Sequence, residues 1–157
     1  MRRIILLILA VTLALPVMAW GPGVTPAAAD SGKDWTAEYF TNRDLVGAAA
    51  FVRLDSAISF DWAGASPVPG IIPPDNFSVR WSGPQDFAGG TYIFSATVDD
   101  GIRIFVNDQL VVDAWYDQIQ TTHTGQITLN PGTYWVRVEY YDAGDQASVF
   151  VSWRPST

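Results

Sequence analysis

The chain has 157 residues, a formal net charge of −7 at pH 7 and no cysteine. Without cysteine it has no disulfide, no thiolate metal site and no lipoprotein attachment point. The acidic balance, with no run of basic residues to follow a phosphate backbone, argues against nucleic acid as a partner.

The N-terminal segment has the pattern of a secretory signal. Two arginines at positions 2 and 3 precede an apolar stretch over residues 4–20. A membrane-spanning helix usually needs about 20 apolar residues without a proline, so a permanent anchor is the weaker interpretation. Small residues allow cleavage after Ala19 or after Ala29. We prefer Ala29, because a spacer of Pro, Gly and Ala without strand or helix signals precedes it.

The rest of the chain is expected to form one secreted domain. Removing residues 1–29, as signal peptide and spacer, leaves seven basic residues against sixteen acidic ones, a net charge of −9. Residues 30–157 have a suitable length for a single domain. The seven Trp, six Tyr and eight Phe of the chain can supply a large apolar core. Stability then has to come from the core, to which a bound hard cation could add.

Short alternating runs of apolar and polar residues predict an all-β domain. Between them, residues 64–74 are proline-rich and predict a long surface loop, and Asn107, Asp108 and Gln109 predict a tight hairpin. Strands at this spacing, without helices for parallel crossovers, predict an antiparallel β-sandwich or a closed barrel. The predicted strands cover residues 36–40, 58–61, 77–81, 91–98, 102–106, 110–113, 123–129, 134–140 and 147–153.

Two successive carboxylates, Asp99 and Asp100, stand before Gly101 between two predicted strands. Because side chains alternate between the faces of a strand, these two cannot reach one target from a regular strand. Two interpretations follow from the residues alone. Either Asp-Gly forms a hairpin turn whose acidic side chains face water, or the two carboxylates share a cation.

The order of short motifs over residues 35–153 resembles the protective-antigen-14 domain family, a β-sandwich module of toxin protective antigen, yeast flocculins and some β-glucosidases. The resemblance implies an antiparallel β-sandwich. The motifs that carry it are Ala37, Glu38, Tyr39, Phe40, Leu45 and Gly47; Ile58, Phe60, Asp61 and Trp62; Pro73 and residues 75–81; Gly90, Tyr92 and Phe94; residues 99–103; residues 110–113 and Trp115; and Gly132, Glu139, Tyr140, Tyr141, Ala147 and Trp153.

The resemblance also implies a calcium site. In sugar-binding members, two adjacent aspartates joined by a cis peptide hold calcium, and Asp99 and Asp100 match them. Calcium takes about 6 to 8 oxygen ligands. Asp142 matches the usual side-chain ligand of the last loop, which is Asn in sugar-binding members, and Gly144 and Gln146 would supply carbonyls. The added charge of Asp142 should tighten cation binding but leave less net positive charge for a neutral sugar.

The implied function is a non-catalytic, calcium-dependent carbohydrate-binding module that takes a glycan or polysaccharide. Asp99, Asp100, Gly101, Tyr116 and Asp145 are its predicted ligand contacts, with Gly101 giving the backbone room near the ion and Tyr116 offering a stacking face. Two alternatives stay open. The last loop is equally typical of a solvated turn, and the domain could be an extracellular protein-interaction or assembly module without a sugar ligand.

Catalysis is not expected. His123 is the only histidine and has no nucleophile motif beside it, so we interpret it as a surface residue. Asp99 and Asp100 are too close together for the two carboxylates of a glycosidase. Trp62, Trp81, Trp115 and Trp153 are predicted to pack, and Arg80 and Arg103 to pair with carboxylates.

Overall fold

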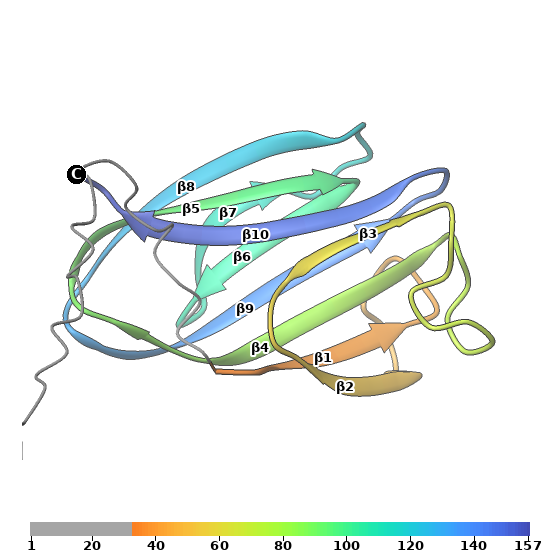
Figure 1. Cartoon of the computed structure of the whole chain (residues 1–157), viewed down its shortest axis with the longest axis horizontal. Coiled ribbons are helices and arrows are strands. Elements are labelled where there is room, and N and C mark those ends of the chain that lie inside the picture. Colours follow the sequence, from red (N-terminus) through yellow and green to blue (C-terminus); the bar gives the residue numbers. More distant parts are fainter. Residues whose placement is uncertain (1–32) are drawn as a thin grey trace, which may run out of the picture.

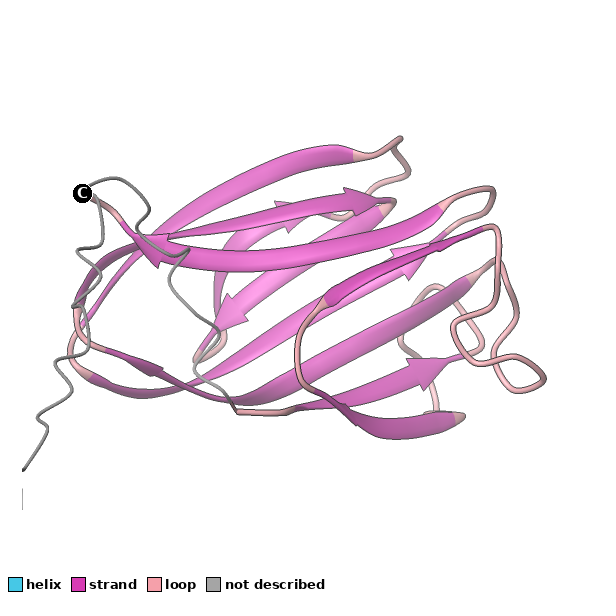
Figure 2. Ribbon diagram, in the orientation of Figure 1, coloured by secondary structure: helices cyan, strands magenta, loops and turns pink. Residues whose placement is uncertain are grey.

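Ten β-strands in two sheets make up the part of the chain that the computed structural model describes, residues 33–157 (Figure 1). The predicted signal peptide lies outside the described residues. Within them every regular element is a strand (Figure 2). The strands are β1 (Trp35–Phe40), β2 (Phe51–Asp55), β3 (Ser59–Ala63), β4 (Phe77–Phe87), β5 (Gly90–Asp99), β6 (Gly101–Val106), β7 (Gln109–Ala114), β8 (Thr121–Leu129), β9 (Gly132–Asp142) and β10 (Ala147–Pro155).

The two sheets lie face to face as a sandwich (Figure 1). The six-stranded sheet has the order β2-β1-β4-β9-β6-β7, and the four-stranded sheet has the order β3-β10-β5-β8. All pairs are antiparallel. The fold therefore confirms the predicted antiparallel β-sandwich and excludes the closed barrel.

Alternation along the strands builds the core. On β5, Phe94, Ala96 and Val98 point inward and are fully buried, while their neighbours are half-buried. Trp81 and Trp153, both predicted to pack, are also buried. Large aromatic side chains thus fill the space between the sheets, and at about 25 cal/mol per Å² they account for much of the apolar stabilisation.

Strand β2 was not predicted, and its burial pattern explains why. It is an edge strand with alternating half-buried and exposed residues, so its sequence lacks a run of core side chains. Its last residue, Asp55, is buried and anchors the strand. The Asp55 carboxylate accepts hydrogen bonds from the Tyr39 hydroxyl at 3.0 Å and the Trp81 indole at 2.8 Å. These long-range contacts are invisible in a local sequence pattern.

Strand β4 is longer than predicted, because it continues past Trp81 through Pro84 to Phe87. Its pairing with β1 ends at Ser82, whereas its pairing with β9 continues to Phe87. Beyond Ser82 the strand is therefore an edge, where proline is tolerated. Pro84 thus marks only the loss of one neighbour.

Two predicted connections are present in the structure. Asn107 and Asp108 join β6 to β7 with φ angles of 46° and 63°, as a two-residue hairpin turn requires. The proline-rich segment 64–74 connects β3 to β4, but it is more than a solvated loop. Its Ile72 is only 2% exposed and belongs to the core.

Candidate functional site

Two connections between the sheets meet at one end of the sandwich. Asp99 ends β5 in the four-stranded sheet, and Gly101 begins β6 in the six-stranded sheet. The loop after Asp142 makes the reverse passage from β9 to β10. Cross-strand pairing places the two passages together, because Asp99 lies opposite Ser148 on β10 and Gly101 lies opposite Tyr141 on β9.

This arrangement decides between the two interpretations of Asp99 and Asp100. Strands β5 and β6 do not pair with each other, so the hairpin interpretation is wrong. The Asp-Gly signal is the same in a hairpin and in a passage between sheets, and only long-range pairing separates them. The peptide bond between Asp99 and Asp100 is cis, as the family resemblance implied.

Asp100 is buried and firmly held. Its two carboxylate oxygens accept hydrogen bonds from the backbone N–H groups of Gln118 at 2.9 Å and Ala143 at 2.8 Å. The Gln118 side chain also donates to the Asp100 carbonyl at 2.9 Å. The neighbouring Asp99 carbonyl accepts from the Tyr140 hydroxyl at 2.6 Å. The Asp99–Asp100 connection is thus fixed by three other segments, and sequence reasoning did not anticipate Gln118.

Asp142 is the unusual residue of this region. It ends β9 opposite Phe77, it is fully buried, and neither carboxylate oxygen has a hydrogen-bond partner of normal geometry. Burial, followed by the charges of Asp100 and Asp75, raises the pKa of Asp142 to about 7. Burial and the charge of Asp100 likewise raise the pKa of Asp99. A carboxylate in this position requires either a proton or a cation.

The oxygen atoms around Asp142 meet only part of what a hard cation requires. Within residues 33–157, no three Asp, Glu or His side chains form a cluster ready to hold a metal ion. Further oxygens would have to come from the main chain of residues 143–146, where the predicted ligands Gly144 and Gln146 lie. Asp142 provides the strongest match, because its two orphaned oxygens are of the kind that calcium binds. The predicted ligand set stays a prediction.

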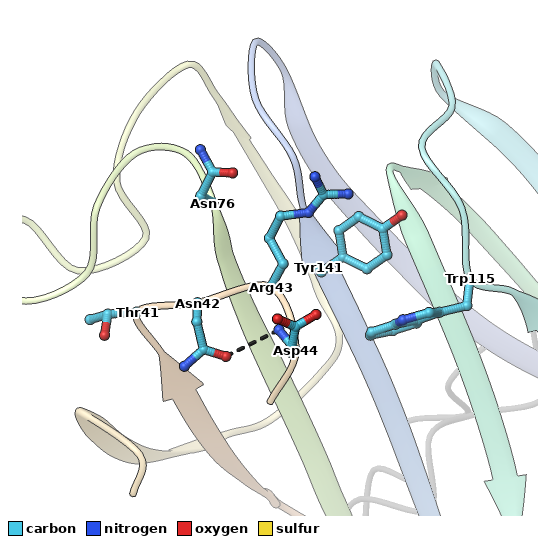
Figure 3. A pocket seen from close by; sticks show the side chains of 7 residues that line it. All are labelled: Thr41, Asn42, Arg43, Asp44, Asn76, Trp115 and Tyr141. Carbon is cyan, nitrogen blue, oxygen red and sulfur yellow. Dashed lines mark hydrogen bonds between the residues drawn. The ribbon is translucent and has the colours of Figure 1, made fainter. Parts of the chain in front are cut away.

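An open hollow of about 610 Å³ lies beside this end of the sandwich (Figure 3). Its aromatic wall is made by Trp115 and Tyr141, whose ring centroids are 4.7 Å apart. The Arg43 guanidinium lies 4.7 Å from the Tyr141 ring centroid and pairs with Asp117. The other lining residues are Thr41, Asn42, Asp44 and Asn76.

Two residues connect the hollow with the acidic side chains of Asp99, Asp100 and Asp142. Asn76 lines the hollow, and its backbone N–H is close enough to Asp142 to oppose the rise in the pKa of that carboxyl group. Tyr141 precedes Asp142 and packs on Gly101, where an added Cβ would lie 2.1 Å from the Tyr141 ring. Gly101 therefore makes room for a ring, whereas the sequence interpretation gave it room for an ion. Asn76 was noted only as a family motif.

The other predicted ligand contacts lie at the surface. Tyr116 is 54% exposed, and its ring centroid is 6.1 Å from that of His123. It lies in the β7–β8 linker that also contains Gln118, so the linker contacts Asp100 while Tyr116 itself remains available. Asp145 is exposed in the last loop. The His123 ring nitrogen Nε2 lies 2.8 Å from the side-chain oxygen of Gln118.

The sequence profile of the PA14 domain matches residues 31–157. The chain belongs to the PA14 domain family. Anti-sigma-I factor RsgI3 of Acetivibrio thermocellus is 37% identical over 125 residues, which cover 78% of this chain and 19% of RsgI3. The solved structure of an anti-sigma factor domain-containing protein is 35% identical, with a TM-score of 0.73, over 78% of this chain and 43% of that one. The PA14 chain thus spans about a fifth of the curated relative and under half of the solved one.

A PA14 sugar-binding domain from an RTX adhesin shares the fold, with 21% identity and a TM-score of 0.64 over 77% of this chain and 89% of that domain. PA14 domains bind sugars in some members of the family. Residues 33–157 of the present PA14 chain show no catalytic domain beside the sandwich. Nor do they contain a helix of the length and apolarity that a membrane crossing requires.

Proposed function

We propose that this PA14 domain is a secreted, non-catalytic module that binds carbohydrate with the help of calcium at the Asp99, Asp100 and Asp142 end of the sandwich. The observation that carries the proposal is the Asp142 carboxylate. It is fully buried among acidic neighbours, and neither oxygen has a hydrogen-bond partner of normal geometry, although the Asn76 backbone N–H lies nearby. A bound cation would neutralise it, and oxygen ligands favour a hard cation such as calcium.

The residues around Asp142 are suited to hold a ligand in a fixed position. Calcium, when bound, supplies coordination positions that the neighbouring hydroxyl groups of a sugar ring can fill. Asp100 is held by the backbone of Gln118 and Ala143, so its carboxylate does not need to reorganise. The hollow lined by Asn76, Trp115 and Tyr141 lies beside it and would receive the remainder of the saccharide.

Binding of a saccharide by this domain is expected to depend on calcium. We would screen the protein on a glycan array in millimolar calcium and in EDTA, and then titrate the best saccharide in solution. Asp142→Ala, which removes both side-chain oxygens, and Asp100→Asn should each lower the affinity at least tenfold. Asp86→Asn is the matched control, because Asp86 is exposed and lies near the far end of β4.

The outcomes separate the parts of the proposal. Binding that is equal in calcium and EDTA would reject the calcium mechanism. Calcium-dependent stabilisation with no saccharide bound would reject the sugar function and favour the alternative, an extracellular protein-interaction module with a structural ion. Retained binding by both Asp142→Ala and Asp100→Asn would place the site elsewhere.

A further inference from the structure

A second hollow lies on the outer face of the six-stranded sheet, away from Asp99, Asp100 and Asp142. It has a volume of about 430 Å³ and lies over strands β4 and β9. Cross-strand pairing of Arg80 with Glu139 and of Ser82 with Arg137 builds its floor. Asp142 is three residues further along β9 than Glu139, so alternation directs the two side chains to opposite faces of the sheet. We call this site, lined by Arg80, Ser82, Trp135, Arg137 and Glu139, the arginine hollow.

Positive charge exceeds negative charge at the floor of the arginine hollow. Three guanidinium groups surround the single Glu139 carboxylate, whose side chain is 8% exposed. The nearest nitrogen lies 2.8 Å away for Arg103 and 3.3 Å away for both Arg80 and Arg137. Among the residues that line the hollow, two guanidinium groups face one carboxylate, so the lining itself carries one excess positive charge that favours an anion, while Glu38, Asp108 and Asp113, opposite Arg103 on β7, lie around it.

The remaining partners of these arginines are weak. Arg80 lies 3.8 Å from Glu38, which is beyond hydrogen-bond distance. Arg137 pairs with Asp108 at 2.7 Å, but the Asp108 side chain is 84% exposed. Ion pairs of this exposed kind contribute about 0 to 1 kcal/mol. A ligand carboxylate or sulfate can therefore replace them at little cost.

Trp135 gives the arginine hollow an apolar wall. Its side chain is 53% exposed, which is unusual for so large an aromatic group in a protein whose other strand tryptophans pack in the core. The backbone around it is fixed, because the Trp135 N–H donates to the Asn107 side chain and the Asn107 N–H donates to the Trp135 carbonyl, both at 2.8 Å. The backbone position of Trp135 is thus fixed, while its exposed indole remains available for contact.

We infer that the arginine hollow binds an anionic sugar, in which the ring stacks on Trp135 and a carboxylate or sulfate group pairs with Arg80 and Arg137. An indole face suits the apolar face of a sugar ring, and guanidinium groups suit planar or multidentate anions. The Ser82 hydroxyl can bond to a ring hydroxyl. This site needs no calcium and lies on the face of β9 opposite to Asp142. It is therefore independent of the proposed calcium site.

The test is titration of the protein in EDTA with three probes: a trimer of galacturonic acid, a sulfated galactose trimer and a neutral galactose trimer. We expect at least one anionic trimer to bind at least tenfold more tightly than the neutral one, and that trimer identifies the anion. Binding should shift the Trp135 indole N–H signal in NMR spectra, assigned by its loss in Trp135→Phe. Arg137→Gln and Trp135→Ala should each lower the affinity at least tenfold.

Arg154→Gln is the matched control, because Arg154 is an exposed arginine on β10 in the other sheet. It should bind as the wild type does. Equal affinity for the neutral trimer, no binding of either anionic trimer, or unchanged binding by folded Arg137→Gln and Trp135→Ala would overturn the inference. An acidic peptide of three glutamates that binds as tightly as the sugars would also overturn it and assign the hollow to protein. Asp142→Asn should leave this binding unchanged, so failure here and failure of the calcium site are distinguishable.

Discussion

Replacing Gly125 with alanine should lower the free energy of unfolding by about 3 kcal/mol. Gly125 lies in the middle of β8, the edge of the four-stranded sheet, and an added Cβ would lie 1.8 Å from the carbonyl oxygen of Val111 on β7. The obstacle is backbone, so no side-chain rotation can relieve it. The two sheet edges would have to move apart. Urea unfolding of the wild type and the variant, followed by circular dichroism, measures the difference.

Thr124→Ala is the control for Gly125→Ala. Thr124 is the adjacent residue on β8 and is exposed, so its loss should change stability by no more than about 0.5 kcal/mol. A Gly125→Ala variant as stable as Thr124→Ala would show that β7 and β8 do not approach each other as closely as the structure has them.

The strands could be predicted where a local pattern determined them. The clean alternation of β5 and β9 reflects one face in the core and one face outside, and both were predicted nearly to their ends. Strand β2 was not predicted, because the hydrogen bonds of Asp55 with Tyr39 and Trp81 hold it in place rather than its own apolar residues. An edge strand held by a long-range polar contact has no local signal.

The candidate site shows a similar division. Family motifs identified Asp99, Asp100 and Asp142, and the structure places them at two adjacent passages between the sheets. The supporting contact from Gln118 comes from a linker without a sequence pattern of its own. The arginine hollow was missed for another reason. Arg80 was correctly predicted to pair with a carboxylate, but the convergence of Arg137 and Trp135 on the same spot depends on strand order.

Asp142→Asn should stabilise the calcium-free protein at pH 8, and the gain should disappear as the pH falls to about 4. The pKa of Asp142 is raised from 3.8 to about 7 in the folded protein. The folded state therefore holds the proton more tightly than the unfolded state. The contribution of the Asp142 carboxyl group to wild-type stability is fully present below its pKa in the unfolded state. This contribution is lost as the pH rises to about 7. Asparagine removes this loss, which is at most about 4 kcal/mol.

Unfolding free energies of the wild type and Asp142→Asn in EDTA at pH 4.5, 6 and 8 measure the effect of Asp142 together with its coupling to Asp75, Asp99 and Asp100, since titrating groups remote from Asp142 cancel in the difference. Asp86→Asn should show the opposite sign, because Lys33 and Thr133 lower the pKa of the exposed Asp86 carboxyl group. The Asp86→Asn variant should therefore gain no stability over the wild type as the pH rises.

Calcium should reverse the order of the two proteins at pH 8. The wild type should gain several degrees in Tm from millimolar calcium, because an ion that binds only the folded state adds its binding free energy to stability. Asp142→Asn should gain less, since its amide oxygen can still ligate the ion but lacks the charge that the ion neutralises. A wild type as stable as Asp142→Asn at pH 8 in EDTA would show that the carboxylate is already compensated within the protein. The case for a cation at this site would then be lost, because a satisfied Asp142 has no need of one.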